Sequence, residues 1–327
     1  MRSHHTGQAH PSDEPARRPA WRGAASVVWG DQPAGDPSDL HRATDTFLLV
    51  RARLFGIAYR MLGSVTDAED LVQEVWLRWQ ICDRAAVRDP AAFLATTATR
   101  LALNQLQSAR VRREAYVGPW LPEPIDTGVH TEVLIERTET VEIVVLFLLE
   151  RLSPLERAAY VLREAFDYPY AEIADILDCS EANARQLVSR ARKHILVERA
   201  TPVARSEQDR FLQAFLDAAR AGDMAGLESI LTADVVSYSD GGEVFHAARF
   251  PLLGRNRVAK FVLAVSEWFW DGVDVQRIEA NGQPALRLSV RGEQIALIAV
   301  SVTEAGIDRL FWMMNTTKLD GVLPGPD

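Results

Sequence analysis

The chain has 327 residues, two cysteines and a formal net charge of −9 at pH 7. This length allows two or three domains. The acidic balance argues against a protein that coats nucleic acid, and two cysteines without metal-ligand spacing predict a reduced, cytosolic protein with no bound metal. No apolar run reaches the length of a membrane span.

Residues 1–45 have the composition of a disordered tail. They are rich in Pro, Gly, Ala, Arg and His and show no lasting hydrophobic period. Such a segment cannot bury a core, and it lacks the continuous apolar stretch of a secretory signal. His4, His5 and His10 have metal-binding side chains, but a flexible tail is the simpler interpretation.

A first helical domain is expected at 46–114. Its first helix has one apolar face, made of Leu54, Phe55, Ala58, Met61 and Leu62. Gly63 is expected to end this helix. Asp89 and Pro90 have the pattern of an N-cap and a first helical residue, so a further helix should begin there and end in a basic cluster.

The helix DAEDLVQEVWLRW between them combines an apolar stripe with a dense polar face. Thr66 to Glu69 has the form of a capping box at its start. The stripe consists of Leu71, Val72, Val75, Trp76 and Trp79. The polar face consists of Asp67, Asp70, Gln73 and Glu74. A face of this kind is usually solvated surface, but here it lies beside large aromatic residues.

An acidic linker is expected at 115–140. From Glu123 to Glu156 there are eight acidic residues and only two basic ones, Arg137 and Arg151. Basic clusters lie before and after this stretch. The alternation predicts two DNA-facing modules joined by a connector that avoids phosphates.

A second helical domain at 141–199 is expected to contain a helix-turn-helix. Ser153 to Glu156, with Pro154 between them, is a strong helix start. In YPYAEIADILDCSEANARQLVSRARK, Ser180 is a good N-cap after a short turn. The second helix has an apolar face of Ala184, Leu187, Val188 and Ala191. Its opposite face suits a major groove and carries Arg185, Gln186, Ser189, Arg190, Arg192 and Lys193. A helical hairpin with a solvated basic face is the alternative.

Residues 205–320 predict an α+β cone with a curved antiparallel sheet. Helical patterns come first, and strand-like runs follow at 273–280, 285–290, 295–303 and 307–315. A pocket in this cone would be lined by Tyr238, Asp240, His246, Trp268, Trp270 and Trp312. Asp240 and His246 would form an acid–base pair there. Without a nucleophile, metal set or cofactor loop beside them, a non-enzymatic domain is the preferred interpretation.

Residues 47–114 resemble region 2, and 141–198 resemble region 4, of bacterial extracytoplasmic-function sigma factors of the sigma-70 family. The two motifs occur in the family's order and spacing. The resemblance implies binding to core RNA polymerase, through the β′ clamp and the β subunit, and promoter-specific transcription initiation. It implies no cofactor and no catalytic group, because the polymerase performs the chemistry.

The same resemblance implies roles for individual residues. The β′ clamp would be bound by Asp67, Asp70, Gln73 and Glu74. The −10 element would be read by Thr96, Thr97, Arg100, Asn104, Gln107, Arg110, Arg112 and Arg113. The −35 element would be read by Ser180, Glu181, Asn183, Arg185, Gln186, Ser189, Arg190, Arg192 and Lys193.

The C-terminal part is similar to the SnoaL-like fold, which includes enzymes and non-catalytic domains. WLPEP at 120–124, YSDGGE at 238–243 and NTTKL at 315–319 resemble signature segments of the sigma subgroup with a fused SnoaL-like domain. There the domain is thought to regulate in cis, with no obligatory anti-sigma factor. The implied contact residues are Trp120, Leu121, Pro122, Asp240, Gly241 and Gly242. Glu243 and Val244 depart from the subgroup's pattern, and a plain turn at Gly241 and Gly242 is the alternative.

Two further classes remain as alternatives. The chain is also compatible with a one-component repressor, or with a SnoaL-type enzyme that carries a DNA-binding leader. The acidic helix beside Trp76 favours a sigma factor, because a repressor needs no polymerase contact. The missing catalytic constellation argues against the enzyme. Whether the C-terminal domain activates or inhibits is left open by the residues.

Overall fold

The computed structural model describes residues 37–114, 116, 118–128, 141–198, 203–242, 247–319 and 322. The chain divides into two compact units, Met1–His41 and Arg42–Asp327. The second unit contains every strand and every helix after the first. Among the described residues, no helix is both long and apolar enough to cross a membrane.

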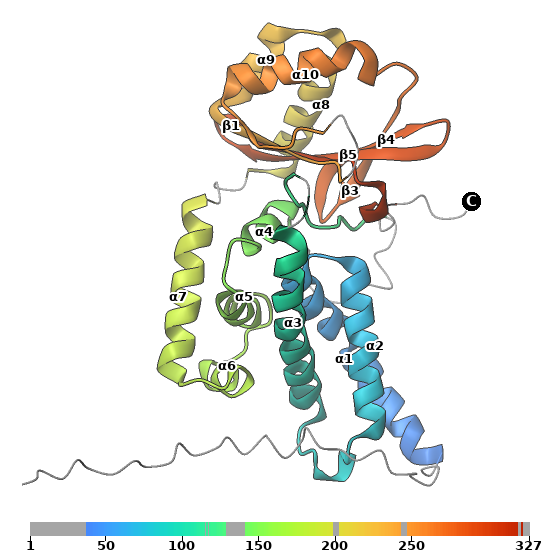
Figure 1. The fold of residues 1–327 in the computed structure, drawn as a ribbon, viewed down its shortest axis with the longest axis vertical. Helices are drawn as coiled ribbons and strands as arrows, with labels where there is room; N and C mark the ends of the chain where they lie inside the picture. Colours follow the sequence, from blue (N-terminus) through green and yellow to red (C-terminus); the bar gives the residue numbers. More distant parts are fainter. Residues whose placement is uncertain are drawn as a thin grey trace, which may run out of the picture. The chain divides into compact units, whose positions relative to one another are not determined.

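The first helical region consists of α1 (Pro37–Leu62), α2 (Val65–Ile81), the 3₁₀ turn η2 (Arg84–Ala86) and α3 (Pro90–Glu114) (Figure 1). Helix α1 begins before the expected position near Asp45. It ends at the predicted place, where Gly63 takes a left-handed φ of +67°. Asp89 caps α3 as predicted, since its carboxylate accepts a hydrogen bond from the amide of Ala92 at 3.0 Å.

The predicted cap of α2 is wrong in one respect. Ser64, not Thr66, is the N-cap, and its hydroxyl accepts a hydrogen bond from the amide of Asp67 at 3.1 Å. Glu69 does not close a capping box, because it pairs with Arg51 at 2.6 Å. A carboxylate distant in sequence takes its place: Glu123 Oε2 accepts from the amide of Val65 at 2.6 Å.

The second helical region consists of α4 (Ile143–Leu149), α5 (Pro154–Tyr160), the π-turn η3 (Val161–Ala165), α6 (Tyr170–Leu177) and α7 (Glu181–Glu198). The capping box of Ser153 and Glu156 is confirmed. Asp178 ends α6 in the left-handed conformation, and Ser180 caps α7 through the amide of Asn183 at 3.2 Å. The predicted apolar face of α7 is buried, so α6 and α7 form the expected helix-turn-helix.

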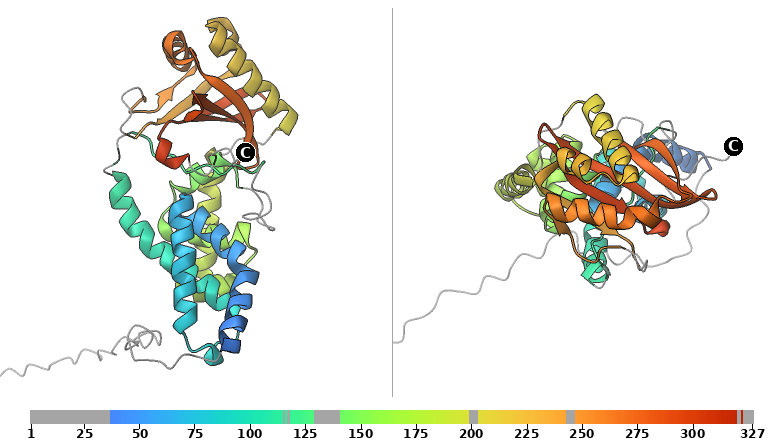
Figure 2. Two further views of the ribbon diagram at one scale, coloured as in Figure 1. Left: turned by 90° about the vertical axis from the view of Figure 1, so that its right-hand side faces the viewer. Right: turned by 90° about the horizontal axis from the view of Figure 1, so that it is seen from above.

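The C-terminal domain is the expected α+β fold. It contains α8 (Arg205–Ala221), α9 (Met224–Ile230), α10 (Arg255–Phe269) and the 3₁₀ turn η4 (Thr316–Lys318). Its strands are β1 (Leu231–Asp240), β2 (Leu252–Leu253), β3 (Asp274–Ala280), β4 (Gln283–Val290), β5 (Glu293–Thr303) and β6 (Gly306–Met313). They form one curved sheet in the order β2-β1-β6-β5-β4-β3, with α8, α9 and α10 on one face (Figures 1 and 2).

The sheet is mixed rather than wholly antiparallel as predicted. Strands β1 and β6 pair in parallel, whereas β3 to β6 form an antiparallel meander. A parallel pair needs a long crossover, and here α10 and four strands separate β1 from β6. Local sequence patterns reveal the strands but not this pairing.

The two faces of the sheet carry different cores. Trp312 points to the helical side, where its ring packs with Phe215 and Phe269. Its neighbour Phe311 points to the other side and packs with Tyr238 and with Phe147 of α4. Alternating strand residues face opposite sides, so the aromatic residues expected to line one pocket are divided between two cores. His246 and the side chain of Trp268 lie outside the described residues.

Candidate promoter-binding and interdomain sites

The residues predicted to read the −35 element share the outer face of the helix-turn-helix. From Ser180 to Lys193, all nine of them are exposed. The Arg185 guanidinium lies 5.1 Å from the ring centroid of Tyr170, and Arg192 pairs with Glu164 at 2.7 Å. Packing and ion pairs therefore orient these cations on a rigid helix. Such a face can meet base edges and phosphates together.

The predicted −10 residues lie on α3, and one of them has a partner in region 4. Arg100 donates from Nε to the carbonyl of Ile176 and from Nη2 to the carbonyl of Asp175, both at 3.0 Å. These carbonyls lie at the C-terminal end of α6, where a cation is favoured. Arg100 thus ties α3 to the helix-turn-helix.

The other predicted −10 residues differ in surroundings. The hydroxyls of Thr96 and Thr97 donate to carbonyls within α3 at 2.7 and 2.8 Å, and Asn104 is exposed. The side chains of Gln107, Arg110, Arg112 and Arg113 lie outside the described residues.

The predicted polymerase face lies on the outer side of α2. Asp70 and Gln73 are exposed, and Asp67 and Glu74 are half-buried. Glu74 pairs with Arg78 one turn later, at 2.7 Å. Four residues of the apolar stripe are buried, and the fifth, Trp76, is half-buried. The apolar face therefore holds α2 against the helical core, and the carboxylates lie on the opposite, outer face of the helix.

The three signature segments meet at the carboxylate of Asp240, which is 0% exposed. Its Oδ2 accepts from Lys318 Nζ and from the backbone amide of Leu121, both at 2.7 Å. Its Oδ1 accepts from the Tyr116 hydroxyl at 2.5 Å. Burial, followed by the bond to Asp240, raises the pKa of Tyr116, so this hydroxyl stays protonated and donates.

Lys318 completes the connection to the linker. Its Nζ also donates to the carbonyl of Leu121 at 2.9 Å and lies 4.1 Å from the ring centroid of Trp120. Leu121 and Pro122 are buried. A Cβ at Gly63 would lie only 2.9 Å from the Trp120 ring, so this indole packs closely against the turn between α1 and α2.

Gly242, the second glycine after Asp240, occupies a backbone position that favours glycine. Gly242 has φ +54°, and a Cβ there would lie 3.0 Å from Asn315 Nδ2. The carbonyl of Asp240 accepts from the amides of Met314 and Asn315 at 2.7 and 3.0 Å. The loop is therefore a turn with a requirement for glycine, and it also delivers Asp240 to the linker.

Sequence reasoning missed several interdomain residues. Tyr116 and Asn281 lie at the junction without belonging to a chemical motif. Arg157 on α5 carried no signal of its own, yet it is buried and donates to the carbonyl of Met61 on α1. Only the pairing of Asn281 with Gly282 carried a signal, and that signal indicates a hairpin turn.

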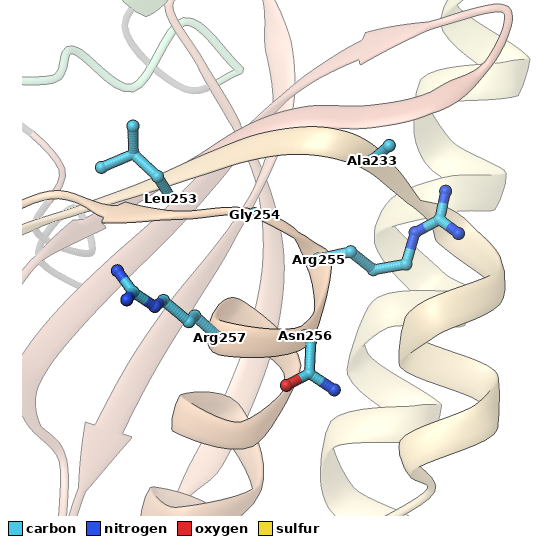
Figure 3. A pocket seen from close by; sticks show the side chains of 6 residues that line it. All are labelled: Ala233, Leu253, Gly254, Arg255, Asn256 and Arg257. Atoms are coloured by element: carbon cyan, nitrogen blue, oxygen red, sulfur yellow. The ribbon is translucent and has the colours of Figure 1, made fainter.

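A pocket of about 490 Å³ lies elsewhere on the C-terminal domain, at the start of α10. Ala233, Leu253 and residues 254–257 line it (Figure 3). The side chains of Arg255 and Arg257 point in different directions, and Arg255 Nε donates to the carbonyl of Leu231 at 2.8 Å. The two cations do not converge on one position, so we assign no ligand to this pocket.

Two family models match the helical regions. Residues 47–112 match sigma-70 region 2, and residues 143–195 match sigma-70, region 4. These two regions place the chain in the class of sigma-70 transcription factors. Members of this class bind core RNA polymerase and direct transcription from specific promoters, and they are initiation factors rather than catalysts.

Similar proteins narrow this class. The ECF RNA polymerase sigma factor SigJ of Mycobacterium tuberculosis is 38% identical over 232 residues, which are 69% of this chain and 74% of SigJ. The probable ECF RNA polymerase sigma factor SigI of the same species is 29% identical over 276 residues, 83% of this chain and 92% of SigI. The crystal structure of M. tuberculosis SigJ matches with a TM-score of 0.68 and 32% identity, over 85% of this chain and 98% of that one. The chain belongs to the extracytoplasmic-function RNA polymerase sigma factors.

Proposed function

We propose that this sigma factor is regulated in cis by its C-terminal domain, which holds regions 2 and 4 in a closed conformation. The observation that carries this proposal is the convergence of three segments on the buried carboxylate of Asp240. One of these segments is the linker between the two promoter-reading regions. The C-terminal domain therefore binds the linker, and this linker limits how far regions 2 and 4 can separate.

Promoter geometry supports a closed, resting role for this conformation. The −10 and −35 elements lie about 25 base pairs apart, or roughly 85 Å along B-form DNA. Arg100 of region 2 is within 3.0 Å of region 4 carbonyls. The two reading surfaces cannot meet both elements while this contact persists. Opening must therefore precede promoter recognition, and a domain that favours the closed form inhibits initiation.

We assign the promoter and polymerase contacts to the surfaces described above. Region 2, at 46–114, would bind the β′ clamp through α2 and the −10 element through α3. Region 4, at 141–199, would bind the β subunit and read the −35 element through α7. This work takes place in the cytoplasm, where core polymerase acts.

The C-terminal domain at 205–320 is proposed to be regulatory rather than catalytic. Asp240, the carboxylate that an acid–base mechanism would need, accepts bonds from Lys318, Leu121 and Tyr116. Tyr238 packs against Phe147 of region 4. Asp240 and Tyr238 therefore make contacts between the C-terminal domain and the helical part of the chain. Regulation in cis by this domain requires no cofactor and no obligatory separate anti-sigma factor.

Reversing Asp70 and Glu74 to Lys should weaken polymerase binding about tenfold or more, because oriented charges set the rate and register of docking. Both side chains lie on the outer side of α2, so folding stability should change little. The measurements are affinity for core polymerase and transcription from a cognate promoter. The matched control reverses Glu293 and Glu304, two exposed carboxylates of the C-terminal domain. Equal loss in both variants would mean that only net charge matters.

A further inference from the structure

The first residue of the hairpin turn between β3 and β4, Asn281, is buried, unlike the residues of most two-residue turns. Asn281 and Gly282 have φ of +53° and +73°, the left-handed conformations that suit an Asn-Gly turn between antiparallel strands. A turn of this type normally projects into solvent. Asn281 is only 2% exposed, so something covers the tip of this hairpin.

The Asn281 side chain is covered by three segments of the sigma core. Its Oδ1 accepts from the amide of Ile125 at 3.0 Å. Its Nδ2 donates to the Tyr59 hydroxyl at 3.0 Å and to the carbonyl of Val141 at 3.1 Å. Tyr59 lies on α1 of region 2, Ile125 in the linker, and Val141 at the start of region 4. One amide thus joins both reading regions and their connector.

The backbone around this turn also captures the linker. Strand β3 is at the edge of the sheet and has unpaired backbone groups to offer. The amide of Thr127 donates to the carbonyl of Glu279, and the amide of Asn281 donates to the carbonyl of Ile125, both at 2.8 Å. Asp126 and Ala280 form an antiparallel bridge between them. The linker therefore pairs with the edge of β3 through one antiparallel β-bridge.

A chain of hydrogen bonds continues from Asn281 into region 2. The Tyr59 hydroxyl donates to the carbonyl of Glu123 at 2.6 Å while it accepts from Asn281. Burial raises the pKa of Tyr59, so its hydroxyl remains neutral and can donate. The Glu123 carboxylate in turn accepts from the amide of Val65, at the start of α2. The turn is thus connected to the helix that carries the polymerase face.

We infer that the Asn281–Gly282 turn is a clasp that positions region 2 against region 4. Separating the regions must break the bond to Tyr59, the bond to Val141, or both. Asn281 acts here as a positioning residue in the turn between β3 and β4, whereas Asp240 binds the linker from β1. The inference rests on the proposed regulation in cis and adds a second contact to it.

The test is hydrogen–deuterium exchange, followed by mass spectrometry, on the free full-length protein with no polymerase or DNA. Asn281→Gly keeps the left-handed turn and its backbone amide but removes the side-chain amide. Arg291→Gly is the matched control, because Arg291 occupies the corresponding left-handed position in the exposed β4–β5 turn. Tyr59→Phe is a second variant that removes only the hydroxyl and leaves the turn unchanged.

We expect Asn281→Gly to speed exchange about tenfold or more in peptides covering 118–128 and 141–149, since about three hydrogen bonds are lost. Tyr59→Phe should speed exchange in these peptides and at the start of α2. Arg291→Gly should leave them unchanged. Native exchange in Asn281→Gly, or an equal rise in the Arg291→Gly control, would overturn the clasp. A rise in Asn281→Gly without one in Tyr59→Phe would overturn its connection to region 2. These outcomes do not depend on transcription, so the clasp can fail while regulation in cis stands.

Discussion

Changing Lys318 to Met should lower the free energy of unfolding by about 3–5 kcal/mol, because it leaves a buried charge without its cation. Asp240 is 0% exposed, and Lys318 Nζ lies 2.7 Å from its Oδ2. Methionine keeps most of the volume of the lysine stem, so the main loss is electrostatic. The same change removes the hydrogen bond to the carbonyl of Leu121 and so weakens the binding of the linker to the C-terminal domain. Urea unfolding followed by tryptophan fluorescence and circular dichroism measures the effect.

Two further variants isolate the cause of this loss. Lys260→Met removes an exposed lysine from α10 of the same domain and should change stability by less than about 0.5 kcal/mol. Adding Asp240→Asn to Lys318→Met removes the unpaired charge and should recover part of the loss. If Lys318→Met is as stable as the Lys260→Met control, Asp240 is not held by this ion pair.

Changing Arg157 to Met should also cost about 3–5 kcal/mol, because it breaks a buried ion pair with Glu150 and removes the hydrogen bond to Met61 of the first helical region. Its guanidinium pairs with Glu150, and it donates to the carbonyl of Met61 on α1 and, at 2.7 Å, to the carbonyl of Leu149. Burial lowers the pKa of Arg157 to about 9, so the guanidinium stays charged at neutral pH. Denaturant unfolding of the full chain measures the loss.

Arg88→Met, at an exposed position, is the control for removing one arginine. Adding Glu150→Gln to Arg157→Met should restore part of the stability, since Glu150 is only 14% exposed and would otherwise keep an unpaired charge. Equal unfolding midpoints for Arg157→Met and Arg88→Met would show that the junction does not depend on Arg157.

Elements defined by neighbouring residues could be predicted from the sequence. The helix-turn-helix is defined by signals within one short segment: Asp178 ends α6, Ser180 caps α7, and the apolar face of α7 is buried. Each of these signals involves residues that are close in sequence. The N-cap of α3 at Asp89 and the capping box at Ser153 are equally local. Periodicity and capping are strong signals because their partners lie within one or two turns.

Contacts between distant residues could not be predicted in this way. The N-cap of α2 is Ser64, two residues before the predicted Thr66, and the carboxylate that completes this helix start comes from Glu123, 58 positions away. Arg100 was assigned to DNA, and no local pattern shows its bonds to the end of α6. The bond between Asn281 and Tyr59 spans 222 positions. The signature segments indicated a shared site at Asp240, but a resemblance and not a residue pattern brought them together.

The central claim is that the free protein holds its two promoter-reading regions together and that its C-terminal domain keeps them so. Pulsed electron paramagnetic resonance between spin labels in the two regions tests it most directly. Ala85→Cys and Ala182→Cys place the labels at exposed positions, with Cys82→Ser and Cys179→Ser removing the native thiols. The account predicts one short distance in the free full-length protein and a distance tens of ångströms longer in the polymerase–promoter complex, because the two elements lie roughly 85 Å apart. A chain ending at Ala200 should already populate the longer distances when free. The same distance distribution in all three samples would contradict the account.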